Sequence, residues 1–157
     1  MTARCVVVLL TAPTWTPPGV DPARWRRALA EDVVDLLSTL ADVDVAIAAT
    51  AADAPLAEAI RWPGTTIHCL PGNEPRPVAA LRAAASAGYD QALVLAADLP
   101  DLPALLVGKL FRPLTSRTVV AAPVLPDRPG MIGLASQLPV PAWLAEADPD
   151  LSGGGPD

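Results

Sequence analysis

The chain has 157 residues, of which 52% are apolar and 18% are charged, and its formal net charge is -6. This length suits one domain, and the apolar content easily supplies a hydrophobic core. The negative charge argues against a dedicated nucleic-acid surface. It does not exclude a small phosphate-bearing ligand, because basic residues can gather locally.

The cysteines and the apolar runs indicate where the protein resides. Cys5 and Cys69 lie in strand-like runs, so a reduced, intracellular pair is the simpler interpretation, although a bridge is not excluded. The apolar run at residues 5–10 is short for a signal-peptide core. No run approaches the roughly 20 apolar residues that cross a bilayer. We therefore expect a cytoplasmic protein without a membrane partner.

Short apolar runs alternate with stretches of helical spacing along the chain. Asp21 and Pro22 are typical of a helix start, as N-cap and first helical residue. Strands are expected at residues 5–10, 43–49, 65–70, 92–97, 118–122 and 131–135. Helices are expected at residues 22 to about 40, 53 to about 62, 78–87 and 103–114. Loops are expected at residues 11–19, 71–77 and 123–130, and a disordered end at residues 152–157.

This alternation predicts an α/β fold, a three-layer sandwich with a mostly parallel sheet. We expect one domain at residues 1–146 and a flexible tail at residues 147–157. There is no Gly-rich dinucleotide fingerprint after the first strand, no Walker loop and no Gly-x-Ser-x-Gly elbow, so those enzyme classes are poorly supported. His68 is the only histidine and has no cluster of zinc-binding spacing around it, so a structural role is expected.

The stretch from Gln91 to Leu102 carries the main candidate site. Six apolar residues, 92–97, end at Asp98, and prolines stiffen the turn that follows. A strand of this kind is typical of a sheet covered on both faces, which puts Asp98 at the carboxyl edge, where ligands bind in open α/β sheets. A carboxylate there can hold a divalent metal that in turn holds phosphate oxygens. Asp98 as a turn or capping residue is the alternative.

Two further features have both a functional and a structural interpretation. The hydroxyls and backbone amides of the loop at residues 11–19 suit phosphate binding, but they equally suit capping and solvation of a turn. Arg24, Arg26 and Arg27 near the start of the first helix form a candidate anion clamp. The alternative is a solvated basic face that pairs with nearby acidic residues such as Glu31.

The order of these pieces resembles the glycosyltransferase-A-like nucleotidyltransferases. The resemblance rests on a first strand running into an Ala-Pro loop, a Pro-Gly step, a long helix and a strand ending Ala-Ala-Asp-Leu-Pro-Asp-Leu. The nearest branch is the small bacterial glycosyltransferase-like proteins related to phospholactate guanylyltransferase. The resemblance runs from about Val6 to Leu134, and its specific part is residues 94–102 with the loop at residues 12–19.

The resemblance implies a nucleotide-diphospho-sugar transferase-like, Rossmann-like fold with Mg²⁺ bound at Asp98. It also implies a nucleotide held by the loop after the first strand, by the Gly-containing loop before the middle helix and by the Pro-Asp-Leu step. Together with the residue patterns above, this gives a candidate nucleotide site of Thr11, Ala12, Pro13, Gly19, Arg24, Gly72, Arg76 and Asp101. No residue is assigned to catalysis.

The chain departs from the family pattern at three points. Residues 20–23 stand where relatives carry Lys and Arg. The acidic residue before the Gly-Gly segment is matched best by Asp127, and the late Asp-rich motif by residues 148–151. Two interpretations follow. One is a nucleotidyl- or glycosyltransferase that binds a Mg-nucleotide or nucleotide-sugar, with a homodimer as its assembly. The other is a catalytically inactive relative acting as a nucleotide- or protein-binding module.

Overall fold

The computed structural model describes residues 2–99, 101–125 and 128–151. The expected disordered end at residues 152–157 and the candidate acidic residue Asp127 lie outside these ranges.

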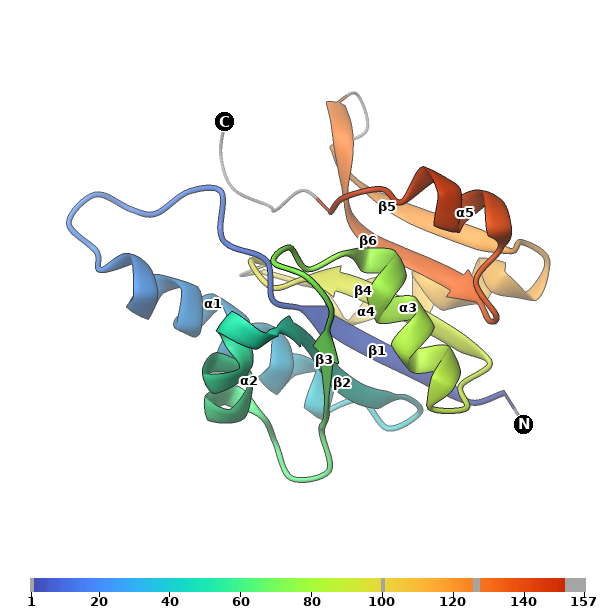
Figure 1. Cartoon of the computed structure of the whole chain (residues 1–157), viewed down its shortest axis with the longest axis horizontal. Coiled ribbons are helices and arrows are strands. Elements are labelled where there is room, and N and C mark those ends of the chain that lie inside the picture. Colours follow the sequence, from blue (N-terminus) through green and yellow to red (C-terminus); the bar gives the residue numbers. More distant parts are fainter. Residues whose placement is uncertain (1, 100, 126–127, 152–157) are drawn as a thin grey trace.

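The described part of the chain forms a six-stranded mixed sheet with the order β3-β2-β1-β4-β6-β5. β1 pairs in parallel with β2 and β4, and β2 pairs in parallel with β3. β6 runs antiparallel between β4 and β5 (Figure 1). The strands are β1 (Arg4–Leu9), β2 (Asp44–Thr50), β3 (Thr66–Leu70), β4 (Gln91–Ala96), β5 (Val119–Leu125) and β6 (Arg128–Gln137).

Helices cover both faces of the sheet. α1, α2 and α4 pack against one apolar cluster, and α3 and α5 pack against the other. This three-layer arrangement confirms the α/β fold class expected from the sequence. The helices are α1 (Pro22–Ser38), α2 (Ala54–Ile60), α3 (Pro77–Ser86), α4 (Ala104–Phe111) and α5 (Ala142–Ala147), with 3-10 turns at Ala51–Asp53 and Arg112–Thr115.

The central strand β1 shows why the apolar runs become doubly covered strands. Successive side chains of a strand point to opposite faces. Val6 and Val8 accordingly lie in the cluster under α1, whereas Val7 and Leu9 lie in the cluster under α3, and all four are fully buried. Polar residues at either position would therefore have to be buried, which explains the uninterrupted apolar sequence.

The start of α1 matches the sequence expectation. Asp21 is the N-cap, its carboxylate accepts a hydrogen bond from the Arg24 backbone N–H at 3.2 Å, and Pro22 occupies the first turn. The helix ends at Ser38, slightly before the expected end near residue 40. There the Ser38 hydroxyl donates to the Val34 carbonyl at 2.8 Å, and Thr39 is the C-cap.

The carboxy-terminal part differs from the sequence expectation. Residues 123–130 were expected to be a loop, but the structure extends β5 and β6 through most of them as a hairpin. The prolines of this stretch are loop signals in the sequence. β5 is an edge strand, and its register shifts on both sides of Pro123, which are the two settings where a strand tolerates proline. The short α5 was not expected either, and Leu144 buries its inner side.

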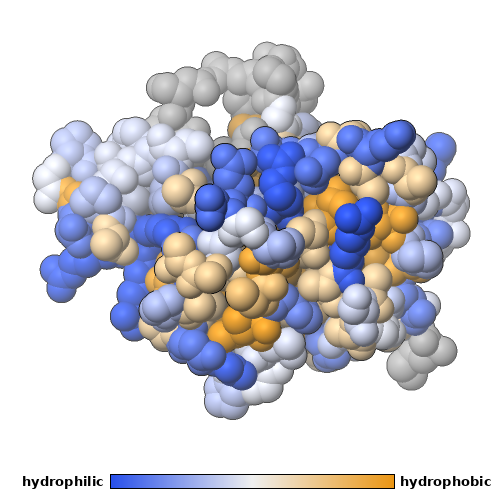
Figure 2. Space-filling view, in the orientation of Figure 1, coloured by the Kyte–Doolittle hydropathy of each residue, from blue (hydrophilic) through white to orange (hydrophobic). Residues whose placement is uncertain are grey.

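The surface and the cysteines complete the description. On the face covered by α3 and α5, apolar and hydrophilic side chains are interspersed in patches (Figure 2). Cys5 is buried, Cys69 is exposed and both are free in the structure. None of the helices within the described ranges has the length and apolar character needed to cross a membrane.

Candidate functional site

The sheet reverses its direction of winding between β1 and β4. From β1 the chain passes to β2 and β3 on one side, and α3 then carries it back to β4 on the other side. In the β1–β4 register Leu9 lies opposite Ala96, so both strands end level with each other. The loop after β1 and the loop after β4 therefore leave the same edge in different directions. Such a switch point is where open α/β sheets bind ligands.

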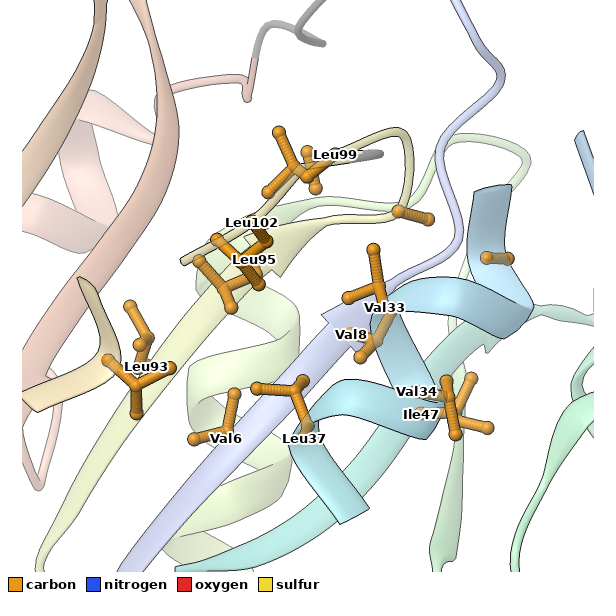
Figure 3. Close-up of a cluster of buried hydrophobic side chains, with 14 of the residues drawn as sticks. Val6, Val8, Val33, Val34, Leu37, Ile47, Leu93, Leu95, Leu99 and Leu102 are labelled. Carbon is orange, nitrogen blue, oxygen red and sulfur yellow. The ribbon is translucent and has the colours of Figure 1, made fainter. Parts of the chain in front are cut away.

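Asp98 lies at this edge, two residues beyond the end of β4. The loop that carries it is folded inward, because Leu99 and Leu102 pack into the core beside Leu95 (Figure 3). Asp98 itself is only 4% exposed. The sequence therefore places this carboxyl group correctly along the strand, but the structure shows it covered and not open to solvent.

The loop after β1 is fixed to α1 by two tryptophans. The Trp25 indole N–H donates to the Trp15 carbonyl at 3.1 Å, and the two rings meet edge to face with centroids 6.2 Å apart. At the start of the loop, the backbone N–H of Thr11 donates to the Leu9 carbonyl at 2.8 Å. The loop thus leaves the sheet in a defined direction before it turns into α1.

The predicted nucleotide residues of this loop fall into two places. Thr11, Ala12 and Pro13 follow β1 directly and lie beside the end of β4. Gly19 lies at the other end of the loop and Arg24 in the first turn of α1. In Figure 1 the start of α1 lies away from the ends of β1 and β4. Gly19 is in the left-handed region at φ 79°, which favours glycine there without any ligand.

The arginines at the start of α1 have different environments. Arg26 forms a two-pronged ion pair with Asp53, at 2.9 and 2.8 Å, and also donates to the Leu10 carbonyl at 3.1 Å. Arg27 pairs with Glu31 at 3.2 Å, and Arg24 is exposed. The three therefore do not form the anion clamp considered from the sequence. Asp53 is 27 residues from Arg26, so no pattern of neighbouring residues in the sequence predicts this pair.

Arg76 is the N-cap of α3, which packs on β1 and β4, so it lies at the same edge as Asp98. Its guanidinium faces the segment after α5. It contacts the Asp148 carboxylate at 3.2 Å, the Asp150 carboxylate at 2.5 Å and the Asp148 carbonyl, and Glu74 is 3.9 Å away. Partial desolvation lowers the pKa of Arg76, but the Asp150 and Asp148 carboxylates outweigh it and the net shift is upward.

The two remaining predicted nucleotide residues are on the surface of their loops. Gly72 is exposed at φ 80° in the turn between β3 and α3, and Asp101 is exposed three residues beyond Asp98. Residues 129–134, which resemble the family's Gly-Gly segment, lie inside β6. There, a β carbon on Gly133 would lie 2.9 Å from a methyl carbon of Leu95, so this glycine serves core packing.

The acidic groups near the edge limit how a metal could be held. Within the described ranges there is no cluster of three or more His, Cys, Asp or Glu side chains that could hold a metal ion. Asp148 and Asp150 face the Arg76 guanidinium, and Asp98 and Asp101 follow the end of β4 at the same edge. Mg²⁺ is commonly bound through one or two carboxylates, with substrate phosphates and water completing its shell. The donor set therefore fits a metal that arrives with a nucleotide and does not fit a metal cage built by the protein.

His68 shows no sign of a role at this edge. It is half-buried in β3, and its Nε2 atom has no hydrogen-bond partner within the described ranges. Burial lowers its pKa. These features are consistent with the structural role expected from the sequence.

Comparisons with known proteins identify the fold. No protein-family profile and no curated protein matches the sequence. Solved structures do match. A protein assigned as a nucleotide-diphospho-sugar transferase from Desulfovibrio desulfuricans G20 superposes with a TM-score of 0.64 at 21% identity, over 87% of this chain and 64% of that one. The chain thus spans less than two thirds of that relative's length.

Two further matches have similar scores. The 4-diphosphocytidyl-2C-methyl-D-erythritol synthase from Anaerococcus prevotii matches with a TM-score of 0.60 at 11% identity, over 87% of this chain and 70% of that one. Rv0371c from Mycobacterium tuberculosis H37Rv matches with a TM-score of 0.61 at 14% identity, over 97% of this chain and 78% of that one. At these identities the likeness establishes the fold alone: this chain has the nucleotide-diphospho-sugar transferase-like α/β fold.

Proposed function

We propose that this chain is a nucleotidyltransferase-like or glycosyltransferase-like protein that binds a Mg-nucleotide or nucleotide-sugar at the carboxyl edge of its sheet. The observation that carries the proposal is the register of Leu9 with Ala96, which brings Asp98 beside the loop after β1 at the switch point. Among the structural neighbours, a CMP-2-keto-3-deoxy-manno-octonic acid synthetase was solved with CTP, and Rv0371c was solved with manganese. The finer proposal is the branch related to phospholactate guanylyltransferase.

Three parts of the proposed site suit phosphate chemistry. Asp98 would hold the metal, which when bound neutralises phosphate charge. The backbone N–H of Ala12 and the hydroxyl of Thr11 would donate to phosphate oxygens. Arg76 would add positive charge once it leaves its present acidic partners. Because Asp98 is 4% exposed, the backbone at residues 97–99 has to shift for a metal to reach its carboxylate.

A second candidate function is a catalytically inactive relative that acts as a nucleotide- or protein-binding module. The engagement of Arg26 and Arg76 with carboxylates of the same chain favours it. Phosphoryl and glycosyl transfer depend on cations that neutralise developing charge. Arginines that are already neutralised contribute less to such a step.

Thermal melting with nucleotides tests the nucleotide site on which the proposal depends. GTP, CTP, UTP and ATP are added at millimolar concentration with and without Mg²⁺. A rise in Tm that requires Mg²⁺ and disappears in Asp98→Asn supports the transferase-like site. Asp32→Asn, an exposed carboxylate on α1, is the matched control and retains the rise. If no nucleotide changes the Tm of the wild-type protein, the nucleotide site is wrong.

A second measurement covers the case in which Asp98→Asn does not fold. Mn²⁺ is paramagnetic and broadens the NMR signals of nearby nuclei. In the wild-type protein, Mn²⁺ with the nucleotide is expected to broaden the amide signals of residues 97–99 and 11–12 selectively. Broadening confined to the exposed acidic residues elsewhere would contradict a metal at Asp98.

A further inference from the structure

We propose a second binding site at the opposite edge of the sheet, which takes a small organic acid with an apolar body. A cavity of about 370 Å³ opens there between α4 and the loop that joins α1 to β2, with the first residue of β1 beneath it. Its volume lies within the range of about 300–1,000 Å³ that is usual for small-molecule sites. The lining includes Arg4, Leu40, Asp42, Val107, Gly108 and Phe111.

The cavity has an apolar wall on each side. Val107, Gly108 and Phe111 recur at three- and four-residue spacing, so they form one face of α4. Leu40 and Val43 lie on the facing loop. The strands of the parallel part begin at this edge and end at the edge that carries Asp98, so the two sites are separated by the length of the sheet.

Arg4 supplies a positive charge at the cavity. Its Nε atom donates to the Gln91 side-chain oxygen at 3.0 Å, and its guanidinium carbon lies 5.6 Å from the centre of the Phe111 ring. These contacts fix the guanidinium but do not neutralise it. No carboxylate within residues 2–99, 101–125 and 128–151 lies within ion-pair distance of it. A half-buried charge without a counter-ion is costly, so an anion is favoured there.

The charges around the cavity also favour an anion. The lining contains two arginines, Arg4 and Arg112, and one carboxylate, Asp42. The local balance is therefore positive, although the whole chain carries -6. A carboxylate is the natural partner, because its two oxygens match the two-pronged geometry of a guanidinium.

Gly108 is an independent sign that the cavity is kept open. Glycine is among the least favourable residues inside a helix, because it gains no packing and loses the most backbone entropy. A β carbon built on Gly108 would meet no atom of the protein within 4 Å. Packing of the chain against itself therefore does not require a glycine here. The missing side chain leaves room in the cavity wall for the apolar body of a ligand.

NMR titration of the ¹⁵N-labelled protein with octanoate and phenylacetate tests this site. We expect saturable shifts confined to the amides of residues 40–43 and 104–115, with octylammonium, the cation of the same chain length, giving none. If neither acid binds saturably, or if the cation binds equally well, the proposal is overturned. The test does not depend on nucleotide binding, so its result and that of the nucleotide experiment are independent.

Three variants assign the binding to this cavity. Arg4→Gln removes the charge and is expected to weaken octanoate binding at least tenfold. Gly108→Leu fills the wall without meeting another side chain at its β carbon, so it is expected to keep the fold and abolish binding. Arg117→Gln removes an exposed arginine outside the cavity and leaves the affinity unchanged. Wild-type affinity in both Arg4→Gln and Gly108→Leu would contradict the site.

Discussion

The Arg26 guanidinium and the Asp53 carboxylate form a two-pronged ion pair that joins α1 to the 3-10 turn after β2. Both side chains are about four-fifths buried, at 23% and 22% exposed. Arg26 also donates to the Leu10 carbonyl, so one side chain connects α1 with the ends of β1 and β2. These contacts hold the base of the loop after β1 in place.

We expect Arg26→Ala to lower the free energy of unfolding by about 2 kcal/mol, because charge-assisted hydrogen bonds of a partly buried pair are lost. Urea unfolding measures this change. Arg27→Ala removes an exposed ion pair with Glu31 at helical spacing and is expected to cost at most about 0.5 kcal/mol. Equal effects of the two variants would show that Arg26 has no special structural role.

The two thiols are expected to differ in reactivity. Burial, and secondarily the charge of Asp44, raises the pKa of Cys5 to about 12, so at neutral pH this thiol stays protonated and out of contact with reagents. Cys69 is exposed. A thiol reagent such as Ellman's reagent should modify one cysteine per native chain and two in denaturant. Cys69→Ser should abolish the native reaction and Cys5→Ser should preserve it; the reverse pattern would contradict the structure.

Stability is expected to fall on mild acidification because of His68. Burial lowers its pKa from the usual 6.5, so the unfolded chain binds a proton at a higher pH than the folded chain does. The contribution of His68 is present above pH 6.5 and is lost as pH falls from there through the lower folded pKa. Urea unfolding between pH 7.5 and 5 should show a smaller loss in His68→Gln than in the wild-type protein.

NMR measures the titration of His68 directly, because His68 is the only histidine of the chain. Its ring protons should titrate with a midpoint below 6.5. A midpoint at or above that value would mean that the ring is solvated or has an anionic neighbour in solution, and the pH dependence assigned to it would be wrong.

Two glycine substitutions are expected to have opposite effects. In Gly133→Ala, the new β carbon would lie 2.9 Å from a Leu95 methyl carbon and 3.5 Å from one of Leu110. Overpacking of this kind costs about 1–3 kcal/mol, and the flexible end of Leu95 absorbs part of the strain. In Gly108→Ala the new β carbon would meet no atom of the protein within 4 Å, so the free energy of unfolding should rise by about 0.5–1 kcal/mol. Thermal unfolding of both variants measures the contrast, and equal shifts would contradict the packing.

The doubly covered strands were predictable from the sequence because burial on both faces leaves a continuous apolar run. Residues 5–10 and 92–97 therefore gave β1 and β4 nearly to the residue. The hairpin of β5 and β6 was not predictable in the same way. Pro123 is a loop signal in isolation, and only its position on an edge strand with an irregular register makes it compatible with β5.

The sequence predicts where each candidate residue lies within its own segment. It does not predict which residues of different segments contact each other. The end of an apolar strand located Asp98, but the burial of its carboxyl group depends on Leu99 and Leu102 folding back into the core. The partners of Arg76 are 72 and 74 residues away along the chain. Periodicity describes one element at a time, so it carries no information about such pairings.

The contacts of Arg76 are expected to hold the segment after α5 in place. Asp148 adopts a left-handed conformation at φ 39°, which directs both its carboxylate and its carbonyl to the guanidinium. Arg76→Gln should therefore release residues 148–151 and speed amide hydrogen exchange there, while exchange in β1 and β4 stays unchanged. Arg82→Gln, which removes a nearby exposed arginine of α3, should leave exchange at 148–151 as in the wild-type protein. Unchanged exchange in Arg76→Gln would mean that packing of Leu151 against the core, and not the ion pairs, holds this segment.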